Sequence, residues 1–191
     1  EMSAWRELGN WLLTVLTKIA SGYWKTMDPQ NGYTVISAAA LRTIELDEMY
    51  EDYGYCNDLL VKLNASGLRV ADVAQPARYG DEESSIRYRS YIPRVSMMLF
   101  GNFLWRLRVK YLLRDFHPLA LLYLLGAPAA VGGVLWGLRR RIAARRRERE
   151  DSGAASDGTP LTLFALGWLS MLLAMVFDME ANADSETRID E

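Results

Sequence analysis

The most chemically suggestive segment of this chain is Asp28–Tyr33, which reads DPQNGY and sets a carboxylate, two amides and an aromatic ring around one glycine. Pro29 fixes its own φ and biases Asp28 toward an extended conformation. Asn31 and Gly32 both tolerate positive φ, so the pattern predicts a sharp turn. Amide and carboxylate groups on such a turn can bind a phosphate or a sugar, and a plain surface turn has the same composition.

A second group of candidate residues is acidic and aromatic. Glu51 and Asp52 are adjacent within Tyr50–Tyr55, which also contains three tyrosines, and Asp58 follows in the first turn of a predicted helix. Paired carboxylates can act as a general base or bind a metal ion, and tyrosine rings can stack on a sugar or a base. A solvated acidic loop is the alternative, and a carboxylate in the first turn favours any helix.

A third group is basic and rich in hydroxyls. Arg78 and Arg87 flank Ser84 and Ser85 just ahead of a long apolar region. The planar fork of arginine suits phosphate oxygens. The acidic residues 81–83 lie between the two arginines and would repel an anion unless they turn away or pair with arginine, so an exposed charged loop is the alternative.

Residues 1–90 must position these groups, and their pattern mixes helices with short strands. The spacing of apolar residues predicts helices over Ser3–Ala20, Ala38–Ile44 and Asp58–Ala65, and strands over Tyr33–Ile36 and Leu68–Val73. Ser37 and Asn57 are expected to cap the second and third helices, and Gly67 to end the third. Helices that alternate with strands indicate an α/β fold. Two strands form no stable sheet alone, so we expect further strands to precede Glu1 and the α/β domain to be incomplete.

Residues 117–179 contain two long apolar runs. Pro118–Leu138 is 21 residues without a charge, and Gly158–Phe177 is 20. A helix of 21 residues spans about 31 Å, close to the thickness of a hydrocarbon core, so we expect two transmembrane helices. The connection at 139–149 holds seven arginines and is expected to contact lipid headgroups, and 180–191 form an acidic tail. Two buried core helices are the alternative.

Residues 91–116 are expected to form an interfacial amphipathic helix. Arg106, Lys110 and Arg114 recur at four-residue spacing, which places them on one helical face. Such a helix would lie with its apolar side in the membrane and its basic residues at phosphate level. An amphipathic helix packed on a protein core is the alternative.

Composition excludes some chemistry. Cys56 is the only cysteine, so no disulfide can form within the chain. The chain has no Asp-x-Asp and no glycine-rich phosphate loop, and its net charge of −2 hides a strong segregation of charge along the sequence.

The order of the motifs adds a resemblance. Ser21–Trp24 leads into Asp28–Tyr33, Glu51–Gly54 precedes Asn57–Leu60, and Arg78–Gly80 precedes the two serines. This order resembles the family-2 glycosyltransferases of the polyprenol-phosphate (dolichyl-phosphate) mannosyl- and glucosyltransferase type, and especially their archaeal membrane-anchored members. The resemblance extends from about Ser3 to Asn182.

The resemblance implies a GT-A domain that moves mannose or glucose from a nucleotide-sugar to polyprenyl or dolichyl phosphate. In the family, the N-terminal half carries Asp-x-Asp, a divalent metal (Mg or Mn) and the nucleotide-sugar, and this chain has none of that half. We therefore expect the acceptor side and membrane anchor of a longer enzyme, inactive alone, with no metal ligands of its own and no nucleic-acid partner.

The resemblance also implies roles for individual residues. Acidic residues near the transferred sugar correspond to Glu51, Asp52 and Asp58, and Asp28 falls in the acceptor-side loop; these four are the expected catalytic residues. Acceptor-binding residues correspond to Gln30, Asn31, Gly32, Tyr33, Arg78, Ser84, Ser85 and Arg87. Relatives usually have lysine where Ile86 stands, and Arg87 is expected to replace it. A lipid monophosphate is already mostly dianionic at neutral pH, so the carboxylates are expected to orient sugar or metal rather than remove a proton.

The expected location is the cell membrane, with two spans. The positive-inside rule places the arginine-rich connection in the cytoplasm, whereas Arg106, Arg108, Lys110 and Arg114 favour the opposite orientation. Nucleotide-sugars are made in the cytoplasm, so we expect the catalytic part there. A non-catalytic membrane protein that binds lipid phosphate or scaffolds a glycosylation pathway is the alternative function.

Overall fold

The computed structural model describes residues 4–74, 88–147 and 158–189. The chain forms two compact units. The first unit comprises Glu1–Asp115 together with Met179–Glu191, and the second comprises Phe116–Asp178. The expectations for Arg78, Ser84, Ser85 and Arg87 lie outside the described residues.

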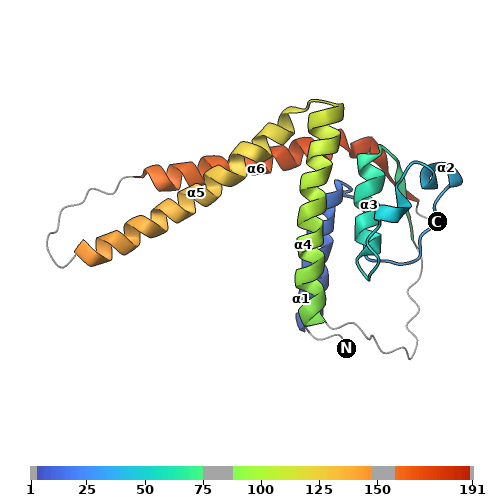
Figure 1. Ribbon diagram of the computed structural model, residues 1–191, viewed down its shortest axis with the longest axis horizontal. Helices are drawn as coiled ribbons and strands as arrows, with labels where there is room; N and C mark the ends of the chain where they lie inside the picture. Colours follow the sequence, from blue (N-terminus) through green and yellow to red (C-terminus); the bar gives the residue numbers. More distant parts are fainter. Residues whose placement is uncertain (1–3, 75–87, 148–157, 190–191) are drawn as a thin grey trace. The chain divides into compact units, whose positions relative to one another are not determined.

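Three helices build the core of the first unit (Figure 1). Helices α1 (Ala4–Ser21), α3 (Tyr55–Ala65) and α4 (Tyr88–Arg106) pack against one another, with α1 and α4 side by side. Their shared interface buries five apolar side chains: Leu13, Ala20, Val61, Val95 and Leu99. The predicted helix over Ser3–Ala20 is confirmed, and its apolar stripe faces this core.

The remaining elements of the first unit are short. They are α2 (Ala38–Leu41), η1 (Leu46–Glu48), β1 (Val70–Val73), the π-helix η2 (Leu107–Arg114), η3 (Ala183–Ser185) and β2 (Glu186–Ile189). The Ser37 hydroxyl accepts a hydrogen bond from Ala40 N and caps α2, as expected. Helix α3 begins before the predicted Asn57 cap, because that asparagine is buried inside the helix and donates to Thr17 Oγ1 at 2.6 Å.

The expected α/β architecture is not what the described residues form. They are mostly helical, and their sheet is a single parallel pair, β1 with β2, in which Val70 lies opposite Glu186 and Val73 opposite Ile189. The predicted strand over Tyr33–Ile36 is wrong. Its residues Tyr33 and Val35 are 89% and 102% exposed, and neither of the two strands among the described residues pairs with this segment.

Tyr23 anchors a second apolar cluster beneath the sheet. Its ring packs with Ile44 and Leu63, and its hydroxyl donates to Leu68 O at 2.6 Å. Burial, and secondarily the charge of Glu186, raises the pKa of Tyr23 well above its usual value. The hydroxyl therefore remains a donor at every physiological pH.

The basic face predicted for residues 91–116 points inward rather than toward phosphates. Arg106 is fully buried, and its Nε donates to Ala20 O at 2.7 Å. Lys110 Nζ donates to Asn64 Oδ1 at 2.8 Å, and Arg114 Nη1 donates to Ala65 O at 2.7 Å. Arg106 and Arg114 therefore satisfy carbonyl groups at the C-terminal ends of α1 and α3, which lack partners within the helix, and Lys110 binds a side chain of α3.

The same segment leaves an apolar stripe exposed. Met97, Phe100 and Leu104 recur every three or four residues along α4, and these three and the adjacent Trp105 are exposed in the first unit. An exposed stripe of large apolar side chains is typical of a surface that meets a membrane or a protein partner.

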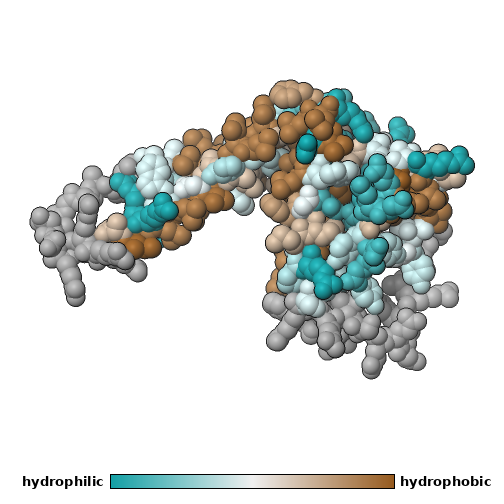
Figure 2. Space-filling view, viewed as in Figure 1, coloured by the Kyte–Doolittle hydropathy of each residue, from teal (hydrophilic) through white to brown (hydrophobic). Residues whose placement is uncertain are grey.

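The second unit is a pair of helices, α5 (Pro118–Arg147) and α6 (Thr159–Ala181). In the described residues both are long and apolar enough to cross a membrane, with mean hydropathies of 1.9 and 2.0 in their apolar parts. Length and composition alone carry this finding, since a buried core helix passes the same test. However, only 33% and 17% of the two apolar windows are buried, and Figure 2 shows hydrophobic side chains gathered over both helices.

Glycines set the close packing of α5 on α6. A Cβ on Gly133 would lie 2.6 Å from Phe164 N, and one on Gly126 would lie 2.9 Å from Gly167 O. Backbones that approach this closely require small residues, a known feature of helix pairs within membranes. The glycines that would weaken a soluble helix thus form the contact surface between the two helices.

Candidate functional site

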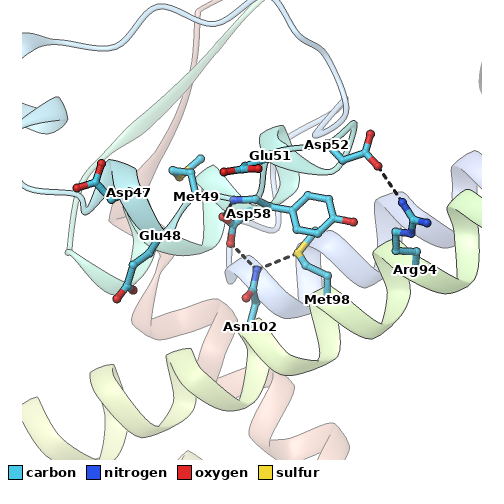
Figure 3. Close-up of a pocket in the computed structure, with 10 residues that line it drawn as sticks. Asp47, Glu48, Met49, Glu51, Asp52, Asp58, Arg94, Met98 and Asn102 are labelled. Atoms are coloured by element: carbon cyan, nitrogen blue, oxygen red, sulfur yellow. Dashed lines mark hydrogen bonds and ion pairs between the residues drawn. The ribbon is translucent and has the colours of Figure 1, made fainter.

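The first unit contains an acidic pocket of about 500 Å3 (Figure 3). Its walls come from η1, the loop that follows it, the start of α3 and one face of α4. The lining residues are Asp47, Glu48, Met49, Tyr50, Glu51, Asp52, Asp58, Arg94, Met98 and Asn102. The pocket therefore brings together Glu51, Asp52 and Asp58, the three carboxylates expected near the transferred sugar, and leaves out Asp28, the fourth expected catalytic residue.

Asp58 is the structural centre of the pocket. The carboxylate is buried, and its Oδ2 accepts from Tyr50 N at 2.9 Å and pairs with Lys62 Nζ at 3.2 Å. Its Oδ1 accepts from Asn102 Nδ2 at 2.7 Å, the contact drawn as a dashed line in Figure 3. Asp58 thus joins the acidic loop, α3 and α4, and its oxygens are already engaged with protein donors.

Asp58→Asn is expected to lower the free energy of unfolding by about 2 kcal/mol, because one carboxylate oxygen becomes an NH2 group that faces protein donors. The midpoint of thermal unfolding in detergent, followed by circular dichroism, measures this change. Asp47→Asn removes a charge from the exposed rim of the same pocket and is the matched control. Equal stability of the two variants would contradict the structural role of Asp58.

Asp52 is tied to α4 by an ion pair. Its Oδ2 lies 3.0 Å from Arg94 Nη1, and its Oδ1 accepts from Tyr53 N at 2.8 Å. Both side chains of the ion pair are half-exposed or more, so the pair contributes little to stability. It does fix the direction of the Asp52 carboxylate at the edge of the pocket.

Glu51 differs from Asp52 and Asp58 in having no hydrogen-bond or ion-pair partner among the described residues. It is exposed, it lines the pocket, and in the described part of the chain it makes no hydrogen bond or ion pair. Figure 3 shows it on the loop between Met49 and Asp52. A free carboxylate on a fixed loop can accept hydrogen bonds from hydroxyl groups of a ligand.

The charge balance of the pocket limits what it can bind. Arg94 offsets Asp52 and Lys62 offsets Asp58, while Asp47, Glu48 and Glu51 remain without a basic partner among the described residues. The excess of negative charge disfavours a phosphate and favours ligands that donate hydrogen bonds, such as sugar hydroxyls. Among the described residues, no group of three or more acidic, histidine or cysteine side chains is arranged to hold a metal ion.

The predicted acceptor loop is ordered by its own side chains. Asp28 Oδ1 accepts from Gln30 N at 3.2 Å, and Asn31 Oδ1 accepts from Tyr33 N at 3.0 Å. The predicted turn is present, and Asn31 N donates to Asp28 O at 3.2 Å across it, although neither Asn31 nor Gly32 has a positive φ.

Two contacts fasten this loop to the helices. Gln30 Nε2 donates to Asn10 O of α1 at 3.2 Å, which occupies one of the amide groups expected to bind the acceptor. Tyr55 at the start of α3 donates its hydroxyl to Gly32 O at 3.4 Å. The loop is thereby connected to the helix that carries Asp58, although none of its residues lines the pocket.

The α4 wall of the pocket was missed by sequence reasoning. Arg94, Met98 and Asn102 are spaced by four residues, so they share one helical face, and this face meets the acidic loop. The four-residue spacing is present in the sequence. The prediction for residues 91–116, however, was based on the basic residues further along, and it was contact with a lipid surface.

No family model matches this chain, and no curated protein or solved structure matches it either.

Proposed function

We propose that this chain is the acceptor-side and membrane-anchor portion of a glycosyltransferase that moves a hexose, mannose or glucose, to polyprenyl or dolichyl phosphate. The observation that carries the proposal is the acidic pocket, which gathers Glu51, Asp52 and Asp58 beside the helix that leads to the apolar helix pair. The ordered set of motifs from Ser21 to Ser85 supports the same family on grounds of resemblance.

The pocket suits the sugar rather than the lipid phosphate. In the proposal, Glu51 accepts hydrogen bonds from hydroxyls of the hexose, and Asp52, fixed by Arg94, faces the same space. A phosphate dianion needs no general base and is expected to bind at basic groups elsewhere, with Arg78 and Arg87 as the candidates. A divalent metal would be held mainly by residues of the donor half.

In the proposal, membrane anchoring holds the reaction at the membrane–water interface, where the phosphate group of a polyprenyl phosphate lies. Helices α5 and α6 supply the proposed spans, and the exposed side chains of Arg139, Arg140 and Arg141 near the end of α5 suit anionic headgroups. The exposed stripe of Met97, Phe100, Leu104 and Trp105 on α4 is proposed to rest on the acyl chains. The catalytic part is proposed to face the cytoplasm.

The direct test is transfer of label in membranes that contain the protein expressed from its complete reading frame. A panel of radiolabelled nucleotide-sugars is supplied with polyprenyl phosphate, and the lipid fraction is extracted and counted. We expect one nucleotide-hexose to label a lipid product that releases free hexose in mild acid. Binding of polyprenyl phosphate with no labelled product from any nucleotide-sugar would replace the proposal with the non-catalytic alternative.

A further inference from the structure

Backbone N–H groups of residues 24–26, just ahead of Asp28–Tyr33, bind the carboxylate of Glu186, which lies near the other end of the sequence. Glu186 Oε1 accepts from Trp24 N at 2.6 Å, and Glu186 Oε2 accepts from Lys25 N at 2.6 Å and Thr26 N at 3.0 Å. Consecutive backbone N–H groups that converge on one anion form a nest, a strong anion-binding arrangement. Glu186 is buried, so these bonds are shielded from water.

Neighbouring contacts extend this connection on both sides. Met27 N donates to Asp72 Oδ2 of β1 at 2.6 Å, so a fourth consecutive N–H of the loop is also held by a carboxylate. Lys25 Nζ donates to Ala183 O at 2.8 Å, and β2, which begins at Glu186, pairs in parallel with β1. All of these groups belong to the first unit, so the arrangement lies within one compact body.

We propose that Glu186 is a positioning residue that holds residues 24–27 and thereby presents the following segment, Asp28–Tyr33. The loop has few other anchors: Gln30 contacts α1, and Gly32 O accepts from Tyr55. An acidic side chain fits position 186 because both of its carboxylate oxygens accept hydrogen bonds from backbone N–H groups. Glutamine would turn an NH2 group toward those donors.

Trypsin provides a test that needs no catalytic activity. The bond after Lys25 joins an exposed lysine to Thr26, whose N–H is held by Glu186, whereas the bond after Arg42 joins two exposed residues far from Glu186 in sequence. In detergent micelles, Glu186→Gln is expected to raise the rate of cleavage after Lys25 about tenfold and to leave cleavage after Arg42 unchanged. Mass spectrometry of the fragments follows both bonds in one digest.

Glu180→Gln is the matched control, because it removes the same charge from an exposed carboxylate at the end of α6. If Glu186→Gln fails to fold, Glu186→Asp, which keeps the charge on a shorter side chain, carries the same comparison with a smaller expected increase. Unchanged cleavage after Lys25 would overturn the proposal. Equal acceleration at both bonds would also overturn it, because it would show that Glu186 stabilises the whole unit rather than the loop.

The consequence for activity rests on the proposed function. In the transfer assay, Glu186→Gln is expected to raise the KM for polyprenyl phosphate about tenfold, with a smaller effect on kcat and partial recovery in Glu186→Asp. Absence of transfer by the unmodified protein would refute the proposed function and leave the digestion result standing. Unchanged KM alongside selective cleavage after Lys25 would overturn the effect on the acceptor and retain the contact with the loop.

Discussion

Replacing Arg106 with alanine is expected to lower the free energy of unfolding of the first unit by about 3 kcal/mol or more. The guanidinium is fully buried and donates from Nε to Ala20 O at 2.7 Å and from Nη2 to Ile19 O at 3.1 Å. Its Nη1 also donates to Tyr111 Oη at 3.4 Å and to Asn64 Oδ1 at 3.5 Å. Removal would leave one buried and one partly buried carbonyl at the end of α1 without these donors and open a cavity beside them.

The backbone around Arg106 is packed closely against its guanidinium, so little rearrangement is expected to compensate for its loss. Gly22 follows α1 with φ at 76°, and a Cβ there would lie 2.5 Å from Arg106 Nη1. A side chain at position 22 would therefore overlap the guanidinium. The expected fall in the midpoint of thermal unfolding is about 10 °C or more. Arg108→Ala, which removes an exposed arginine two residues away, is the control and should change the midpoint little. Similar midpoints for the two variants would show that the buried contacts of Arg106 do not hold the helices together.

The largest effect on activity is expected from Glu51→Gln. Glu51 faces the pocket without a partner among the described residues, so no contact that supports the fold is lost when its charge is removed. In the proposed reaction its carboxylate orients the hexose, and loss of one such contact in the transition state lowers transfer about a hundredfold. The assay is initial-rate transfer of labelled hexose to polyprenyl phosphate in membranes that hold equal amounts of each variant.

Two comparisons make the Glu51 result interpretable. The thermal midpoint of Glu51→Gln should equal that of the unmodified protein, which separates it from Asp58→Asn, whose defect is expected in folding. Asp47→Asn carries the same loss of charge on the outer wall of the pocket and should retain most of the activity. Undiminished transfer by Glu51→Gln would remove this carboxylate from the reaction.

Local patterns predicted the helices well. The apolar spacing in Ser3–Ala20 and the Ser37 cap of α2 each depend on residues within a few positions of one another, and both are confirmed. Gly67, expected to stop a helix, has φ at 72° just beyond the end of α3. The two long apolar runs appear as α5 and α6, both with ends beyond the predicted ones.

Long-range contacts could not be predicted from the same patterns. The four-residue spacing of Arg106, Lys110 and Arg114 identifies a common face, but spacing cannot say whether lipid phosphates or helix ends meet that face. Here Ile19, Ala20 and Ala65 supply the acceptors, and they come from distant parts of the sequence. The expected α/β domain failed for the same reason, since a strand exists only where a second strand pairs with it.

In the candidate site, too, residues close in sequence were predicted and contacts between distant residues were not. Glu51, Asp52 and Asp58 are close in sequence and were predicted together, and the pocket contains all three. Their distinct roles depend on Arg94, Lys62 and Asn102, which decide that Asp58 is engaged and that Glu51 is free. The sequence prediction, which depended on residue type, gave all three carboxylates the same role.

The contacts of Asn182 and Glu186 imply an order of events during biosynthesis. Asn64 Nδ2 donates to Asn182 Oδ1 across 118 positions, and Trp24 N donates to Glu186 across 162. Because the ribosome makes Asn182 and Glu186 only after both apolar helices, these contacts of the N-terminal helices can form only after α5 and α6 have been synthesised. Polypeptides that end before residue 182 would therefore lack the acceptor that Asn64 and Lys110 share in the folded unit.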